Sequence, residues 1–257
     1  MDGARATVRS ELAAGFDPLF IDSSGRSAIE CACIRGANQR SNPLYVYRST
    51  ESPAVERHRA AIVEALLDAG VPLTLLGPNN WSIAHYAAYY DRPQILAALF
   101  NAAGPEAAAL ANMVAHNWTP LHFAARGAYS DCVRLLLRAG ADVNARCKIC
   151  GNALEVAICE STEHAQHVNS LPYEASVPGS GERPENHRVY PLLLAAGATI
   201  PPDADDAYLR KVRAVGFPAY EKAHRMRLTA TFAAKFPRLP VEVAAQVVAF
   251  AFHVGYY

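Results

Sequence analysis

Apolar residues recur at helical spacing in short segments of this chain, and several of these segments end at a glycine. Segments 66–70 (LLDAG), 135–140 (LLLRAG) and 192–198 (LLLAAGA) each have this form. A glycine suits the end of a helix because the residue that closes it often takes a left-handed conformation. Segment 12–17 (LAAGFD) has the same ending, so we expect a single helix at the start of the chain.

A second pattern lies at the start of other helices. The sequence TPLHFAA at 119–125 is followed by an apolar helix and then by AGADVNA at 139–145. Weaker copies begin at Ser27, Ser82 and Asn152, so that successive copies are separated by 55, 37 and 33 residues. The last spacing equals a known repeat period of about 33 residues, and the first two indicate insertions.

Segment 119–145 closely resembles an ankyrin repeat, whose signature is T-P-L-H-x-A. This resemblance implies an all-α ankyrin-repeat solenoid with short β-hairpin fingers. We expect an array over residues 1–200, with a half repeat at about 5–21 and four repeats near 22–77, 78–113, 114–146 and 147–200. Two inserts, near 37–58 and 161–188, are expected to interrupt it.

The motif residues have mechanical roles in this interpretation. Thr119 is expected to cap a helix, and Pro120 fits its first position, where no N–H is needed. The resemblance implies that His122, and His85 at the equivalent position, bond neighbouring turns and are not catalytic. Glu30 and Glu155 stand at this position in the other copies, where we expect weaker internal bonding.

Residues 201–257 lack the repeat motif and are expected to form a helical C-terminal cap. One helix follows Asp205 or Asp206, and a second follows Phe217, with its buried side drawn from Ala219, Met226, Thr229, Phe232 and Ala233. A third begins after Pro240 and is strongly apolar: Val241, Val243, Val247, Val248, Phe250 and Phe252. Solenoids need such caps. The sequence LPVEV at 239–243 also resembles the opening of an F-box, which would recruit an adaptor of a ubiquitin ligase.

Composition and charge limit the classes of function that this chain can have. The 257 residues carry 24 basic and 24 acidic side chains, and this balance excludes a bulk nucleic-acid binder. Charge is nevertheless uneven, because residues 208–238 hold eight basic side chains against Glu221 alone. A solvated helix face is the first explanation of this run; contact with the array or with an anionic partner would be others. We expect a monomer without membrane segments, in the reducing cytoplasm or the nucleus.

The strongest chemical signal is a cysteine pair, Cys147 and Cys150, followed by Gly151. With Cys159, His164 and His167 downstream, it suggests either a zinc site or a redox pair. The repeat register opposes a metal site because it separates Cys159 from the pair by a helix. Motifs typical of phosphate binding, zinc proteases or serine hydrolases are absent. The resemblance also implies an array without a built-in catalytic crevice, so we expect neither catalysis nor a cofactor.

A binding surface is therefore the main functional prediction. In ankyrin repeats, partners usually contact the fingers and the first helices, and tryptophan, tyrosine and arginine are enriched in interface hot spots. The residues expected on this face are Arg26, Arg35, Trp81, Tyr89, Tyr90, Trp118 and Arg126. The alternative for the tryptophans is that they only brace the fingers. We therefore expect a module that binds a protein partner; the other hypotheses are a ligase substrate receptor and a metal- or redox-dependent protein.

Overall fold

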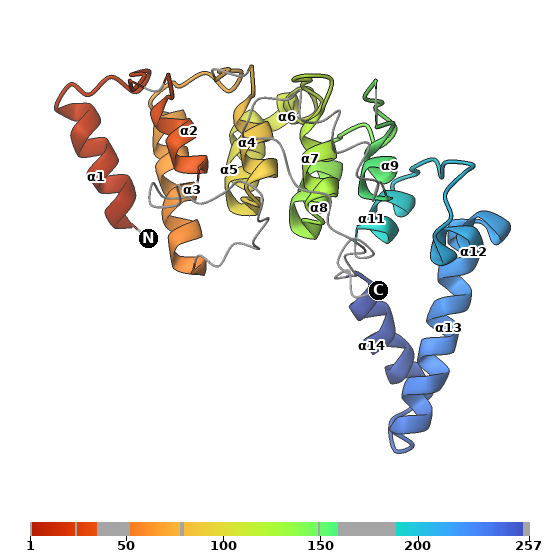
Figure 1. Ribbon diagram of the computed structural model, residues 1–257. Helices are drawn as coiled ribbons and strands as arrows, with labels where there is room; N and C mark the ends of the chain where they lie inside the picture. The colour runs from red at the N-terminus through yellow and green to blue at the C-terminus, as the bar shows by residue number, and fades with distance from the viewer. Residues whose placement is uncertain are drawn as a thin grey trace.

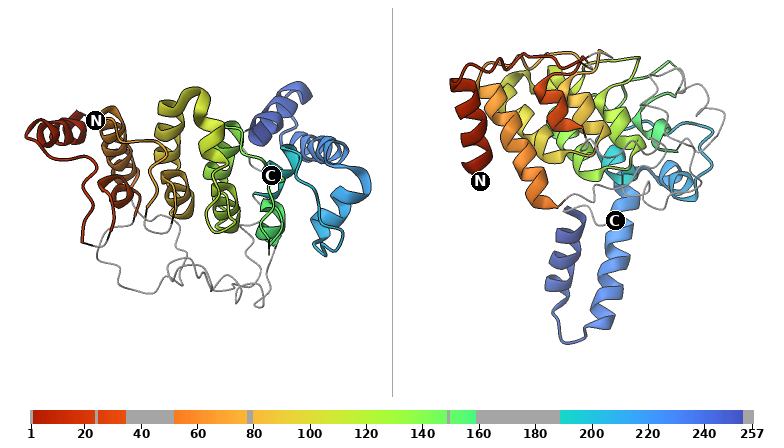
Figure 2. Two further views of the ribbon diagram at one scale, coloured as in Figure 1. Left: turned by 90° about the horizontal axis from the view of Figure 1, so that it is seen from above. Right: turned by 60° about the vertical axis from the view of Figure 1, so that its left-hand side comes forward.

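The computed structural model describes residues 2–23, 25–34, 52–77, 80–148, 150–158 and 189–253. Over these residues the helices stack in two parallel rows (Figures 1 and 2). The first row contains α2 (Ala28–Cys33), α4 (Ile83–Tyr89), α7 (Pro120–Arg126) and α9 (Ala153–Ile158). The second contains α1 (Asp2–Ala13), α3 (Pro53–Asp68), α5 (Pro93–Ala103), α8 (Ser130–Arg138) and α11 (Tyr190–Ala195). Each helix contacts the next one in its row, which confirms an all-α solenoid.

The loops between repeats lie along one edge of the array, the upper edge in Figure 1. They form four fingers: residues 14–27, 70–82, 112–118 and 140–152. The expected β-hairpins are not seen in the described part of these loops. Each finger instead contains an isolated antiparallel bridge, joining Ile21 to Ser27, Leu76 to Ser82, Ala115 to Trp118 and Cys147 to Gly151.

The first-row helices begin at residues whose side chains bond to the helix backbone. Ser27 and Ser82 accept hydrogen bonds from the N–H groups of Glu30 and His85, and Thr119 forms the same capping box with His122. Pro120 occupies the first turn of α7 as expected. Such caps satisfy N–H groups that have no partner inside the helix.

Alanine allows the first-row helices to pack closely. Ala87 and Ala88 of α4, and Ala124 and Ala125 of α7, are fully buried. Small side chains at these positions bring neighbouring helix axes close together. Leucines and isoleucines fill the wider space toward the second row, where Ile95, Leu96, Leu136, Leu154 and Leu193 are also fully buried.

The boundaries of the inserts differ from those expected. Residues 53–58 belong to α3, because Ser52 caps that helix and Pro53 begins it, so the first insert cannot extend to 58. Residues 37–51 of that insert and all of 161–188 lie outside the described residues. A further addition follows α5, where η1 (Gly104–Glu106) and α6 (Ala107–Ala111) precede the third finger. This addition accounts for the spacing of 37 residues between Ser82 and Thr119.

A buried ion pair joins three helices of the first two repeats. Arg92, which is fully buried at the start of α5, pairs with Glu56 of α3. Its Nε also donates to the carbonyl oxygen of Cys33 at the end of α2, at 3.2 Å. Removing one partner of such a pair leaves an uncompensated buried charge, so Arg92 and Glu56 fix how these helices meet.

The carboxyl end closes the array only in part. Leu209 and Val212 of α12 (Ala207–Val215) are buried in the core that the repeats share. Phe217 and Tyr220, at the start of α13 (Phe217–Lys235), also pack against it. The rest of α13 then leaves the array, and α14 (Val241–His253) packs against α13 (Figure 2, right).

Two sets of expectations are wrong because of this geometry. Ala219 and Met226 are exposed, while Thr229, Phe232 and Ala233 are half-buried, since α13 extends beyond the repeats. Among the described side chains of α14, Ala244 and Val248 are buried, whereas Val241, Val243 and Val247 are exposed. The side chains of Phe250 and Phe252 lie outside the described part. Hence α14 packs against α13, and three of the apolar side chains that the sequence placed in the cap are exposed.

Candidate functional site

Two histidines, His85 and His122, each connect their own repeat to the following one through the imidazole ring. Nδ1 of His85 accepts the backbone N–H of Ser82 at 3.2 Å, so Nε2 carries the proton and donates to the carbonyl oxygen of Trp118, also at 3.2 Å. His122 repeats this arrangement with the N–H of Thr119 and the carbonyl oxygen of Gly151, at 3.1 and 3.2 Å. Both rings therefore hold the adjacent finger, as their motif position implied.

Burial keeps both rings neutral at physiological pH. The pKa of His85 is lowered to about 4 by loss of hydration, although its hydrogen bond to the Trp118 carbonyl acts in the opposite direction. Burial likewise lowers the pKa of His122, again against a bond to the Gly151 carbonyl. A neutral ring fits because Nδ1 must accept while Nε2 donates. These histidines are positioned as structural links.

Glu30 and Glu155 do not behave as the sequence suggested. Glu30 is buried, and its Oε2 accepts both the N–H and the hydroxyl of Ser27, at 2.6 and 2.8 Å. The bonds of the cap are thus kept, while Oε1 of Glu30 is buried without a hydrogen-bond partner in the described part of the chain. A carboxylate can satisfy the cap because it accepts as Nδ1 does, but it has no proton for a finger carbonyl. Glu155 instead pairs with Arg146 at 3.1 Å.

Aromatic rings from two adjacent repeats form one cluster, made by the first-row helices α4 and α7 and by the fingers that precede them. Phe123 lies between the two tryptophans, with ring centroids 4.8 Å from Trp81 and 4.9 Å from Trp118. Tyr89 meets Trp81 edge-on at 5.2 Å. Aromatic pairs at these distances add stability beyond the area that they bury. Phe123 was not among the expected site residues, although the sequence places this aromatic residue directly after the motif residue His122.

The two tryptophans are not available to a partner. Trp81 and Trp118 are only 2% and 4% exposed, so the expectation that they line an open surface is wrong. Neighbouring repeats cover them, and this supports the alternative that they brace the fingers.

The exposed edge of this cluster is made of other residues. Tyr89, Tyr90 and Arg126 are half-buried at the last turns of α4 and α7. The rings of Tyr89 and Tyr90 meet at right angles, 4.9 Å apart, and the guanidinium carbon of Arg126 lies 5.6 Å from the Trp118 ring centroid. We call these three residues the aromatic rim. Arg26 is also half-buried but belongs to the first finger, and Arg35 lies outside the described residues.

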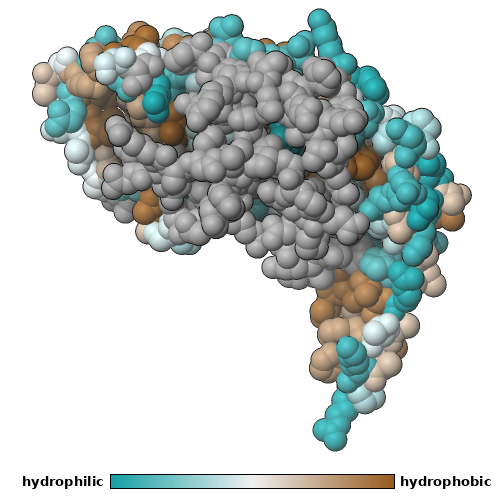
Figure 3. All heavy atoms as spheres, viewed as in Figure 1, coloured by the Kyte–Doolittle hydropathy of each residue, from teal (hydrophilic) through white to brown (hydrophobic). Residues whose placement is uncertain are grey.

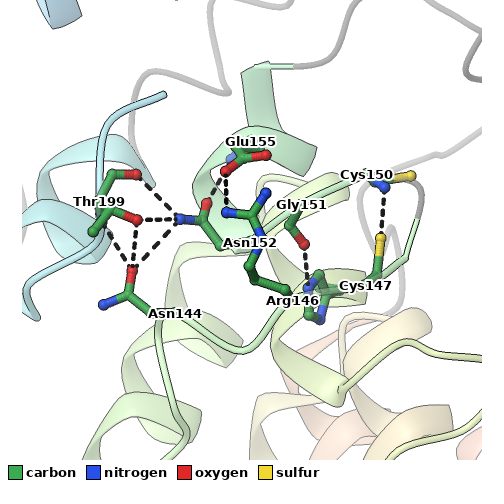
Figure 4. A network of polar contacts seen from close by, with 9 residues as sticks. Asn144, Arg146, Cys147, Cys150, Gly151, Asn152, Glu155 and Thr199 are labelled. Carbon is green, nitrogen blue, oxygen red and sulfur yellow. Dashed lines mark hydrogen bonds and ion pairs between the residues drawn. The ribbon is translucent and has the colours of Figure 1, made fainter. Parts of the chain in front are cut away.

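The fourth finger is fixed to the next loop by a polar network (Figure 4). Asn144 Oδ1 accepts the N–H of Thr199 at 2.9 Å, and Asn152 Nδ2 donates to Thr199 Oγ1 at 2.9 Å. Asn152 also caps α9, because its Oδ1 accepts the N–H of Glu155 at 2.9 Å. Since every member bonds to another part of the array, this network holds the last repeat in register.

The cysteine pair lies at the tip of the same finger. Cys147 and Cys150 are buried, and the N–H of Cys150 donates to Cys147 Sγ at 2.7 Å. The backbone bridge from Cys147 N–H to the Gly151 carbonyl oxygen, 2.8 Å long, closes the turn (Figure 4). The other candidate ligands, Cys159, His164 and His167, lie outside the described residues. The pair therefore has a structural place in the finger, and our expectation that it does not hold a metal stays a prediction.

Part of the apolar surface of α14 is open to solvent where the sequence suggested a cap. Val243 and Val247 are 37% and 43% exposed, and they stand on a hairpin of helices that extends away from the repeats (Figure 1). The basic residues of this region have local partners: Arg225 pairs with Glu221, and Arg210 with Asp205. These two pairs show that the basic run is at least partly compensated within its own helices.

The comparison with known families agrees with the stacking seen here. Residues 53–147, from the start of α3 to the fourth finger, match a family model described as ankyrin repeats in three copies. In the part of the chain that the structure describes, none of the helices is both long enough and apolar enough to span a membrane.

Proposed function

Because the chain is an ankyrin-repeat protein, we propose that it binds a partner protein on the face formed by its first-row helices and fingers. Repeats of this family are typically non-enzymatic and serve in protein–protein interaction. A fold does not specify its target, so the site has to be argued from the side chains.

The aromatic rim is the observation that carries this proposal. Tyr89 and Tyr90 present two adjoining phenol rings at the end of α4, and Arg126 presents a cation at the end of α7, a helix that contacts α4 directly. These residue types dominate the binding energy of protein interfaces. The buried rings of Trp81, Phe123 and Trp118 form a rigid base beneath them. A partner would lose less side-chain entropy on such a pre-ordered surface than on flexible side chains.

Affinity capture from a cell extract tests this role when matched variants are compared. The test variant is Tyr90→Ser with Arg126→Glu, and the control is Arg138→Glu, which changes an exposed residue on α8 in the second row. We expect a specific protein to be recovered by the unmodified chain and the control, and to fall at least about tenfold for the test variant, as loss of a hot spot of about 1.4 kcal/mol implies. Equal recovery with all three, with equal melting temperatures, would contradict the proposed face.

A second candidate function is supported by the exposure of α14. A substrate receptor of a ubiquitin ligase would hold its target on the repeats and recruit an adaptor through a box-like helix. Val243 and Val247, which a cap would bury, are exposed on α14, while Ala244 and Val248 attach that helix to α13. A helix held in this way can present an apolar stripe to a groove on another protein.

Direct binding to a purified box-recognising adaptor separates this function from simple scaffolding. Val243→Ser with Val247→Ser should abolish binding, whereas the exposed control Val215→Ser on α12 should preserve it. Absence of binding by the unmodified chain at about 50 μM would remove this candidate and leave the interaction role intact.

A further inference from the structure

The two cysteines at the tip of the fourth finger contact each other through a sulfur and a backbone nitrogen. Both are thiols, and Sγ of Cys147 accepts the N–H of Cys150 over 2.7 Å (Figure 4). Two covalent bonds separate that nitrogen from Cβ of Cys150, so rotation of the Cys150 side chain can turn its sulfur toward the sulfur of Cys147. The turn therefore brings the two thiols within reach of each other.

Closure of this finger does not require sulfur. The backbone N–H of Cys147 donates to the carbonyl oxygen of Gly151 at 2.8 Å, and the same oxygen is bonded by Nε2 of His122. Ala115 holds the bridge position of the third finger that Cys147 holds in the fourth, so a methyl group is sufficient there. The two sulfur atoms therefore add a chemical capacity that the turn itself does not need.

The hydrogen bond to Cys147 has a chemical consequence. A backbone N–H that points at sulfur stabilises negative charge on that atom. The thiolate, and not the thiol, is the nucleophilic form of cysteine. This bond therefore favours Cys147 as the nucleophile of the pair.

The pair is sheltered, but it lies close to the surface. Cys147 is 5% exposed and Cys150 is 8% exposed, while Lys148 between them is exposed. The finger projects at the upper edge of the array, where Figure 3 shows hydrophilic surface. A bulky oxidant cannot reach sulfur atoms with so little exposure, whereas a small hydroperoxide can.

The other described cysteines lack this arrangement. Burial raises the pKa of the Cys33 thiol to about 12 and also raises the pKa of Cys132, so both thiols are poor nucleophiles. Cys31 is exposed on α2, but Cys33 follows it by two positions, a spacing that turns helix side chains away from each other. Among the described residues, only the fourth finger places two cysteines in one turn.

We propose that Cys147 and Cys150 form a reversible dithiol–disulfide site that a small hydroperoxide oxidises. The Cys147 thiolate attacks one peroxide oxygen, so that an S–O bond forms, the O–O bond breaks and the other oxygen leaves with a proton. The Cys150 thiol then loses its proton and attacks Sγ of Cys147; the S–S bond forms, and hydroxide leaves and takes that proton. Two electrons pass from the sulfurs to the peroxide. Two molecules of a small thiol restore the dithiol by exchange.

Peptide mapping of the full chain after treatment with hydrogen peroxide tests this chemistry, which does not depend on the proposed interaction. Trypsin cleaves after Arg146 and Lys148, so a disulfide leaves residues 147–148 attached to the peptide that begins at Ile149. Dimedone, which reacts with sulfenic acids, detects the intermediate. The variants are Cys147→Ser and Cys150→Ser, and the control is Cys31→Ser, which removes an exposed cysteine of α2.

We expect the linked peptides in the folded, unmodified chain and in the control, and we expect dithiothreitol to separate them. Cys150→Ser should trap at least about tenfold more sulfenic acid at Cys147 than Cys147→Ser traps at Cys150, because the second thiol resolves the first.

The first of these measurements uses the unmodified chain, so it does not depend on how the variants fold. Linked peptides that form only in urea would overturn the proposal, and so would equal trapping in the two single variants. One equivalent of zinc in protein purified without added metal, with oxidation blocked until the zinc is removed, would also overturn it, because the sulfurs would then be metal ligands.

Discussion

At the scale of single residues, the repeat-to-repeat links depend on proton positions. His85 can hold Ser82 and the Trp118 carbonyl together only while its ring is neutral. Protonation of Nδ1 would place a proton opposite an N–H donor inside the core. Desolvation is the largest cause of the lowered pKa of His85, so burial of the ring is the main obstacle to its protonation.

Stability should therefore fall in acid. The pKa of His85 drops from 6.5 in the unfolded chain to about 4 in the fold, so the stabilisation is complete above pH 6.5 and is lost as pH falls toward 4. The shift corresponds to about 3 kcal/mol. Urea unfolding at pH 7, 5.5 and 4.5 measures it. His85→Asn should lower stability at pH 7 and flatten this dependence, whereas an unchanged slope would mean that His85 is not the group responsible.

Leu136 and Leu135 provide a matched pair for the packing of α8. Leu136 is fully buried and Leu135 is half-buried, although both belong to the same apolar run. Leu136→Ala should reduce the unfolding free energy by about 2–5 kcal/mol, because it opens a cavity between repeats. Leu135→Ala should cost less than half as much. Denaturant titration of both variants decides this, and a larger loss for Leu135 would place the wrong side of α8 in the core.

Sequence reasoning succeeded at the residues whose role is local. The caps at Ser27, Ser82 and Thr119 depend on three or four consecutive residues, and the sequence contains all of them. The burial of Trp81 depends on Phe123, which follows it by 42 positions and belongs to the next repeat. A motif places a ring on a helix face, but only the packed neighbour determines whether the ring reaches solvent.

At the scale of elements, α14 was the least predictable helix. Its composition indicated burial against the repeats, and the described contacts of this helix are mainly with α13. The length of α13, 19 residues, carries α14 away from the array, and no local pattern revealed how far that helix would extend. The inserts illustrate a similar limit, because the end of the first depended on the cap at Ser52.

Adjacent valines of α14 test this arrangement. Val248→Ser should destabilise the α13–α14 hairpin by about 1–3 kcal/mol, because that side chain is 7% exposed. Val247→Ser should change stability by less than about 0.5 kcal/mol, because Val247 already faces solvent. Amide hydrogen exchange in α13 reports both effects. Equal destabilisation by the two changes would show that α14 is covered on both sides.

At the scale of the whole molecule, each repeat is stabilised by its neighbours, because each first-row helix packs against the following one. The links at His85 and His122, the Arg92–Glu56 pair and the network around Asn152 join different neighbours along this array. A rigid array of this kind holds the three residues of the aromatic rim in fixed positions.

Amide hydrogen exchange of the chain with and without its captured partner tests the central claim most directly. The account predicts that the partner slows exchange in the last turns of α4 and α7, around residues 86–90 and 123–127, while the second-row helices α5 and α8 are unchanged. The binding energy should come from the rim at these turns. Protection confined to α5 and α8, with no change at these turns, would contradict it.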